Sequence, residues 1–248
     1  TKSDSVALLQ KAAAVVVATD SQQRCAEDLL GAKAAIFFAP RCPEIGFEPL
    51  PQLDQLILDA RSSAHPAVTV AWSGALRHQK RPEWIEPIHR ALSTKLPGLV
   101  TLVAGPAPRD EGERARARDL AAVPGIALVP PFPGGGPGVG ATGTMLAATD
   151  AVLNTSRTEG KSNFLLEAIA TSTPVVAANT PGNRDWLGGA ALLYGEPPEA
   201  VSALNEVLTN PKASKRQAEL ALNSAGLHNA RLAEIDAIAR AHQVALAR

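Results

Sequence analysis

Short apolar runs alternate with helix-like patterns along most of this chain. Between the runs, apolar residues recur at the spacing of amphipathic helices, as in Phe164, Leu165, Ala168 and Ile169. The runs themselves are apolar at nearly every position, which is typical of parallel strands covered by helices on both faces. The pattern therefore predicts an α/β fold with a Rossmann-like, doubly wound parallel sheet, whose expected strands are Val68–Trp72, Leu99–Ala104, Ile126–Val129, Ala151–Asn154, Pro174–Ala178 and Ala191–Tyr194.

Proline and glycine modify the helical part of this pattern. A helix is expected from about Glu83 to Lys95, where Pro82 suits the helix start and Pro87 should produce a kink. The glycine-rich segment 134–143 contains a G-x-G-x-x-G sequence, but prolines separate it from the preceding strand. Because a dinucleotide-binding loop follows its strand directly, we expect a flexible surface insertion here. Three helices are expected at the end of the chain: Glu199–Leu208, Ala213–Ala225 and Ala230–Ala247.

The N-terminal region repeats the alternation on a smaller scale. It contains the expected strands Ala14–Ala18 and Ala34–Phe38 around a helix, Ser21–Leu30. Two strands cannot bury both faces of a sheet, so this region resembles the remnant of a larger sheet domain. The domain organisation expected from these patterns is a remnant at 1–49, a Pro-rich linker with one helix at 50–66, the main domain at 67–197 and C-terminal helices at 198–248.

Charge limits the classes of partner that we expect, and cysteine content indicates the compartment. The chain has 24 basic and 24 acidic residues and no dense Lys/Arg block, which argues against nucleic acid and anionic membranes as partners. No apolar run approaches the ~20 residues needed to span a bilayer. Cys25 and Cys42 form no metal or redox motif, so an intracellular reducing compartment is expected. The cytoplasm is the expected location, or an organelle if a targeting segment preceded Thr1.

The segment 154–178 carries the most informative chemistry. Glu159 and Glu167 bracket a polar turn and the start of a helix. Backbone N–H groups at a helix N-terminus attract phosphate, and a carboxylate can accept hydrogen bonds from two neighbouring hydroxyls. The segment therefore predicts a site for a phosphorylated, hydroxylated ligand. The alternative is that both glutamates belong to solvated helix surfaces.

The segment contains the pattern Ser-x-x-Glu-Gly, six residues, Glu-Ala and then Thr-Pro-Val-Val, formed by Ser156, Glu159, Gly160, Glu167, Ala168, Thr173, Pro174, Val175 and Val176. In this pattern it resembles the C-terminal domain of the group 1 glycosyltransferases, retaining enzymes of the GT-B fold that use nucleotide-diphosphate sugars. The resemblance implies that Glu159 lies beside the donor sugar and that Glu167 binds the ribose hydroxyls. It places the turn formed by Gly160, Lys161, Ser162 and Asn163 against the sugar and pyrophosphate, and Phe132 near the nucleobase.

A second candidate cluster follows the strand at Val68. Arg77 and Lys80 can neutralise the pyrophosphate leaving group, although basic residues in a loop are often only solvated. Ala75 occupies a position where the family usually has Arg. A branch of glycosyltransferase 1 domain-containing proteins instead reads Leu-Arg-x-x-Lys-x-Pro, which residues 76–82 match, so Arg77 is the expected substitute. No metal is expected, because two cations and a helix N-terminus can carry the charge of the leaving group. No cofactor is expected either, since the nucleotide-diphosphate sugar is the donor substrate.

Two main functions remain open from the sequence, and a GT-B epimerase, which shares the fold and would also need a complete cleft, is a third possibility. The first is retaining transfer of a hexosyl group from a nucleotide-diphosphate sugar to an acceptor that the sequence does not identify. The second is a non-catalytic, glycosyltransferase-derived structural subunit of a larger protein assembly. In either case the resemblance covers only the second half of a GT-B enzyme, so a protein partner or an N-terminal domain is expected to cover the cleft face.

Overall fold

The strands of the main sheet are all parallel, and they follow one another outward from the centre of the sheet in both directions. The computed structural model describes residues 14–17, 20–31, 35–38, 51–60, 68–129 and 139–224. In that part of the chain the sheet has the strand order β5-β4-β3-β6-β7-β8. The order reverses between β3 and β6, and ligands of such sheets bind at this point, outside the carboxyl ends of the strands. The strands are β3 (Val68–Ser73), β4 (Leu99–Ala104), β5 (Ile126–Leu128), β6 (Ala151–Asn154), β7 (Val175–Ala178) and β8 (Leu192–Tyr194).

Helices cover both faces of this sheet, as the apolar runs predicted. One face packs against α3 (Pro51–Ala60), α6 (Val139–Ala147), α7 (Asn163–Ala170) and α8 (Pro181–Leu187). The other packs against α4 (Ile85–Ser93), α5 (Glu111–Ala121) and α9 (Pro197–Thr209). Helix α10 (Pro211–Ser224) lies against α9 and the short turn η4 (Gly188–Ala190). The doubly wound α/β fold is thus confirmed.

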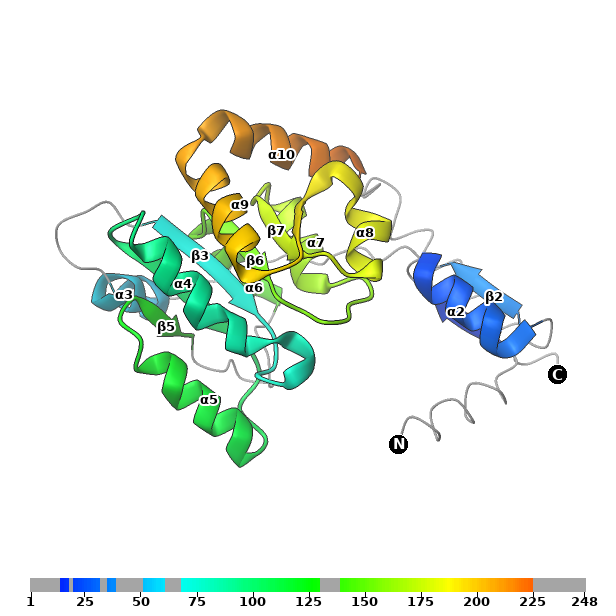
Figure 1. Cartoon of the computed structure of the whole chain (residues 1–248), viewed down its shortest axis with the longest axis horizontal. Helices are drawn as coiled ribbons and strands as arrows, with labels where there is room; N and C mark the ends of the chain where they lie inside the picture. Colours follow the sequence, from blue (N-terminus) through cyan, green and yellow to red (C-terminus); the bar gives the residue numbers. More distant parts are fainter. Residues whose placement is uncertain are drawn as a thin grey trace.

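The N-terminal region forms a small unit of its own. Strand β1 (Ala14–Val17) pairs in parallel with β2 (Ala35–Phe38), and α2 (Asp20–Leu30) packs on both. Helix α2 also lies beside α8 (Figure 1), where Arg24 Nη2 is 3.5 Å from Asp185 Oδ1. The strand, helix and strand expected here are confirmed. That this unit is the remnant of a larger domain, and the domain boundaries themselves, stay predictions.

The expectation of a flexible insertion is wrong from residue 139 onward, because α6 begins there. The helix buries Thr142, Met145 and Leu146, and this burial outweighs the cost of about 1 kcal/mol that each helical glycine carries. The chain must also cross from the edge strand β5 to β6 in the middle of the sheet, and the crossover between parallel strands is usually a helix. Residues 130–138, including Phe132, lie outside the described part of the chain.

The helix after β3 begins later than expected. Two 3₁₀ turns, η2 (His78–Lys80) and η3 (Pro82–Trp84), precede α4. Pro87 is therefore the third residue of α4, in the first turn, where its missing N–H removes no hydrogen bond within the helix. The predicted kink at Pro87 is thus replaced by a helix start. At the end of the chain, α9 and α10 confirm two expected helices, and the third lies outside the described residues.

Candidate functional site

The loops that follow β3 and β6 are hydrogen-bonded to each other. The Arg157 backbone N–H donates to Gln79 O at 2.9 Å, and Gln79 Nε2 donates to Thr158 Oγ1 at 3.1 Å. Parallel neighbouring strands end at the same edge of a sheet, so residues far apart in sequence meet here. This is the point at which the strand order reverses.

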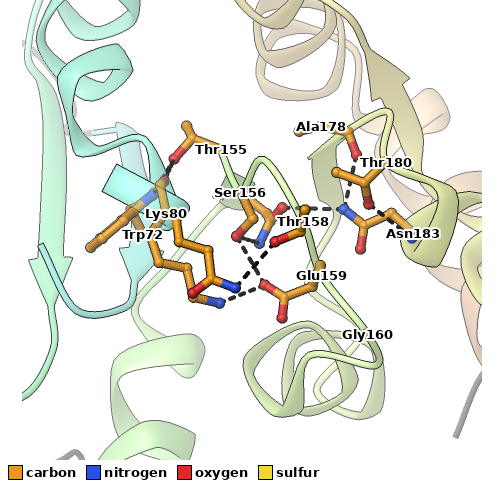
Figure 2. Close-up of polar contacts among 12 residues, drawn as sticks. Trp72, Lys80, Thr155, Ser156, Thr158, Glu159, Gly160, Ala178, Thr180 and Asn183 are labelled. Atoms are coloured by element: carbon orange, nitrogen blue, oxygen red, sulfur yellow. Dashed lines mark hydrogen bonds and ion pairs between the residues drawn. The ribbon is translucent and has the colours of Figure 1, made fainter. Parts of the chain in front are cut away.

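Lys80 and Glu159 form an ion pair at the junction of these loops. Lys80 Nζ lies 2.5 Å from Glu159 Oε2, and the two side chains are only 25% and 13% exposed (Figure 2). Ser156 Oγ donates a second hydrogen bond to the same carboxylate oxygen at 2.9 Å. Hydrogen bonds to a charged group are stronger than those between neutral groups, so this carboxylate is held in a defined orientation.

The backbone at Lys80 is fixed by a buried relay. Trp72 Nε1 donates to Thr155 Oγ1 at 2.8 Å, and Thr155 Oγ1 donates to the Lys80 carbonyl at 2.5 Å (Figure 2). Trp72 and Thr155 are almost completely buried. The relay therefore connects the end of β3 to the end of β6 and holds the Lys80 backbone beside Glu159.

Helix α8 supports the turn after Glu159. A Cβ atom added at Gly182 would lie 1.8 Å from Glu159 O, so only glycine allows this close approach of the two backbones. Trp186 Nε1 donates to Gly160 O at 3.2 Å. The Lys161 ammonium lies 5.6 Å from the centre of the Trp186 ring.

An open cavity of about 370 Å³ lies between these loops and α7, and we call it the β3–β6 hollow. Its size falls within the range of small-ligand pockets, roughly 300–1,000 Å³. At its edge, Ser162 occupies the N-cap position of α7 and makes no side-chain capping bond to the helix. The hollow is lined by Ser73, Lys80, Thr142, Glu159, Lys161, Ser162, Asn163, Phe164 and Glu167.

Glu167 lines the hollow from α7. It follows Asn163 by four positions, which places both residues on the same face of the helix. Partial burial raises the pKa of the Glu167 carboxyl from its ordinary value of 4.5 to about 7. The protein thus keeps a carboxyl group where its charged form is poorly solvated.

The structure brings together most of the residues predicted for the site. Arg77 is an exception: it is 54% exposed, it does not line the hollow, and its Nε lies 3.9 Å from Glu113 Oε1 on α5. Gly160 lies beside the hollow on the turn between Glu159 and Lys161. Phe132 lies outside the described residues. The predicted roles of Arg77 and Phe132 therefore stay predictions.

Sequence reasoning missed three polar residues at or behind the site. Thr142 was missed because its segment was expected to be a loop. Thr155 directly follows the apolar strand β6, where a buried polar side chain requires a hydrogen-bond partner, and that requirement was the signal available for it. Asn183 lies within α8, and its burial follows from tertiary packing.

Two further expectations concern metal and membrane. The described residues contain no group of three or more His, Cys, Asp or Glu side chains arranged to hold a metal ion. Within the same residues, no helix has the length and apolar character needed to cross a membrane.

Comparison with solved structures finds the same fold in structures that include sucrose-phosphate synthase and trehalose-phosphate synthase. Sucrose-phosphate synthase from Thermosynechococcus elongatus matches at a TM-score of 0.73 and 18% identity, covering 98% of this chain and 61% of that one. The UDP-forming α,α-trehalose-phosphate synthase from Burkholderia vietnamiensis matches at 0.68 and 12%, covering 93% and 59%. An E. coli structure, "Trehalose-6-phosphate from E. coli bound with UDP-2-fluoro glucose", matches at 0.73 and 15%, covering 96% and 62%.

This chain therefore spans about three fifths of the length of these structures. At such low identity the likeness establishes the fold, which includes the Rossmann-like half of a GT-B protein, as the sequence predicted. A comparison with curated proteins found no match. The family model for glycosyl transferases group 1 matches residues 67–210, more than half of the chain and all of the β3–β6 hollow. The chain thus belongs to the glycosyl transferases group 1 family.

Proposed function

We propose that the β3–β6 hollow binds a nucleotide-diphosphate sugar and that the protein transfers its hexosyl group to an acceptor with retention of configuration. The observation that carries this proposal is the Lys80–Glu159 ion pair, which lies at the reversal point of the sheet and shares one hollow with Glu167. Family membership supports the reaction class.

Different residues of the hollow are suited to different parts of the donor. Glu167 is suited to the ribose, because an ionised carboxylate accepts hydrogen bonds from two neighbouring hydroxyls. The Lys80 ammonium and the N-terminus of α7 are suited to the pyrophosphate. Glu159 then faces the sugar, with its orientation set by Ser156.

Charge on the diphosphate grows as the reaction proceeds. The bond between sugar C1 and the diphosphate oxygen breaks, and its electron pair stays on the departing diphosphate. A positioned ammonium and helix N-terminus stabilise that charge without rearranging, which is where such groups contribute most to the rate. With retention, the acceptor hydroxyl oxygen bonds to C1 on the face from which the diphosphate leaves, and the hydroxyl proton passes to the departing diphosphate oxygen. The donor is a substrate, so the proposal needs no cofactor.

A second candidate function is a non-catalytic subunit that retains a nucleotide-sugar site. The observation that favours it is the position of Arg77, which lies against Glu113 outside the hollow, while Ala75 stands at the family's usual Arg position. The hollow would then hold the diphosphate with Lys80 and Lys161, the two lysines among its lining residues. This candidate predicts binding of the nucleotide without transfer of the sugar.

The expected surroundings of the site belong to the same proposal. A protein partner or an N-terminal domain would cover the cleft face and supply the acceptor site. We place the protein in a reducing intracellular compartment, the cytoplasm, because Cys25 is an exposed free cysteine.

Calorimetric titration with UDP and GDP tests the donor site. We expect the wild type to bind one of these nucleotides, and Lys80→Ala and Glu167→Ala each to weaken its affinity about tenfold or more, the usual effect of removing a hydrogen bond to a charged group. The matched control is Glu219→Ala on α10, whose carboxylate is exposed and does not line the hollow. If the wild type binds neither nucleotide, the donor-site assignment is wrong.

A further inference from the structure

Asn183 is a completely buried polar residue behind the β3–β6 hollow. It lies in α8, it is 0% exposed, and it does not line the hollow. Its side chain is nevertheless connected to the hollow by a series of hydrogen bonds that ends at Glu159 (Figure 2). No part of the proposed donor binding uses Asn183 directly.

The neighbours of Asn183 fix the orientation of its amide. Nδ2 donates to the Ala178 carbonyl at 2.9 Å and to Asn154 Oδ1 at 3.2 Å. Both partners are acceptors, so the NH₂ end of the Asn183 amide must face them. This contact in turn orients Asn154, whose Oδ1 accepts from Asn183.

The orientation of the Asn154 amide determines the direction of the hydrogen bonds that lead to Glu159. With Oδ1 facing Asn183, Asn154 Nδ2 donates to Ser156 Oγ at 3.2 Å. Ser156 Oγ accepts that bond, and its own proton is donated to Glu159 Oε2 at 2.9 Å. Every donor in the series therefore points toward the carboxylate, and such aligned bonds strengthen one another.

Lys80 and Ser156 both bind Oε2 of Glu159. Among the described residues, the structure shows no hydrogen bond to the other carboxylate oxygen, Oε1. Oε1 is therefore the oxygen left to accept a hydrogen bond from a ligand in the hollow. Its direction depends on the two bonds that hold Oε2.

Two backbone contacts lie beside the start of this series. The Tyr194 hydroxyl donates to the Asn154 carbonyl at 2.9 Å, which fixes the backbone at Asn154. Thr180 Oγ1 accepts from the Asn183 backbone N–H at 3.1 Å and so caps α8. The Asn183 side chain is oriented by its own bonds to Ala178 and Asn154, which do not involve Thr180.

Asn183 is a poor choice for stability alone. Its Oδ1 is buried and has no hydrogen-bond partner within the described part of the chain. A buried acceptor without a partner destabilises a fold, whereas an apolar residue of similar shape at the same place has no such cost. An amide at this position therefore calls for a role beyond packing.

We propose that Asn183 is a positioning residue that acts through Asn154 and Ser156 to aim Glu159 at the donor sugar. This inference rests on the proposed donor site and assigns the recognition of the sugar and of the nucleotide to different residues. The Asn183 series governs recognition of the sugar, while Glu167 and Lys80 bind the nucleotide part. Loss of the series reorients Glu159 and leaves the nucleotide contacts in place.

The experiment compares the affinities of a nucleotide and of its sugar conjugate. Calorimetry gives the Kd of UDP and UDP-glucose, or of GDP and GDP-mannose if the wild type prefers guanine. For Asn183→Leu we expect about tenfold weaker binding of the nucleotide sugar, the usual effect of a misplaced charge-assisted hydrogen bond, with nucleotide affinity unchanged within about twofold. Ser156→Ala should reproduce this loss, and the double variant should lose no more than either single variant, because both residues act in one series.

Thr180→Ala is the matched control. It removes the cap of the same helix, and so destabilises α8, but it leaves the Asn183 side-chain bonds in place. Its ratio of nucleotide to nucleotide-sugar affinity should equal that of the wild type. Equal weakening of both ligands in Asn183→Leu, additive losses in the double variant, or a Thr180→Ala ratio that shifts equally would overturn the positioning role. Failure of the wild type to bind any nucleotide would instead refute the donor site itself.

Discussion

Glu167→Gln should stabilise the protein at alkaline pH while it weakens nucleotide binding. The free protein holds the Glu167 carboxyl in a partly buried position, which raises its pKa from 4.5 to about 7. Between these two pH values the folded state binds a proton that the unfolded chain has released. The contribution of Glu167 to stability is therefore full below pH 4.5 and is lost as the pH rises through about 7. Glutamine keeps the size of the side chain and does not titrate.

The size of the effect follows from the two pKa values. At roughly 1.4 kcal/mol per pH unit, the difference between 4.5 and about 7 corresponds to about 3 kcal/mol. Glu167 lines an open hollow, and solvent screens a partly exposed carboxylate, so the observable difference should be about 1–2 kcal/mol. The variant should thus exceed the wild type by this amount at pH 8 and by much less at pH 5.

Urea unfolding followed by circular dichroism at pH 5 and pH 8 measures this difference. The quantity of interest is the unfolding free energy of the variant minus that of the wild type at each pH, which cancels other titrating groups. Glu219→Gln, at an exposed carboxylate on α10, serves as the control and should show no comparable pH-dependent gain. If the gain for Glu167→Gln is the same at both pH values, the argument from burial is refuted.

Three further predictions concern buried hydrogen bonds and close packing in the fold. Thr155→Val removes a hydroxyl that both accepts and donates a buried hydrogen bond, and should lower the unfolding free energy by about 1–3 kcal/mol in urea titrations. Gly182→Ala forces a Cβ to within 1.8 Å of Glu159 O and should lower the melting temperature clearly, whereas Gly189→Ala, with open space around its Cβ, should change it little; equal effects would contradict the close packing. Burial lowers the pKa of His89 below 6.5, so the stability that neutral His89 contributes is present above pH 6.5 and lost as the pH falls; His89→Gln should flatten that part of the pH profile measured by thermal unfolding.

Local sequence patterns predicted most of the main sheet. The continuously apolar runs located β3, β4, β6 and β7 within a residue or so, because a strand covered on both faces needs apolar residues at every position. The prediction was wrong at α6, because the glycines at 140 and 143 are typical of loops, whereas packing stabilises a helix there. It also misjudged Pro87, since helix starts depend on where the preceding loop ends.

The candidate site was only partly accessible from the sequence. Glu159, Glu167 and the turn between them are close along the chain, so their spacing already indicated one site. Lys80 could be named as a candidate, but its contact with Glu159 joins residues 79 positions apart. The same sequence logic placed Arg77 beside Lys80, whereas the structure holds Arg77 against Glu113.

The sequence by itself determined the strands, the fold class and the pair of glutamates at the start of α7, because periodicity and turn chemistry are properties of neighbouring residues. Only the tertiary structure decided which loops meet, since that depends on the order of strands in the sheet. It brought Lys80 to Glu159, buried Glu167 enough to raise its pKa, and connected Asn183 to the hollow through Asn154. Contacts of this kind depend on packing and on burial, which no local stretch of sequence specifies.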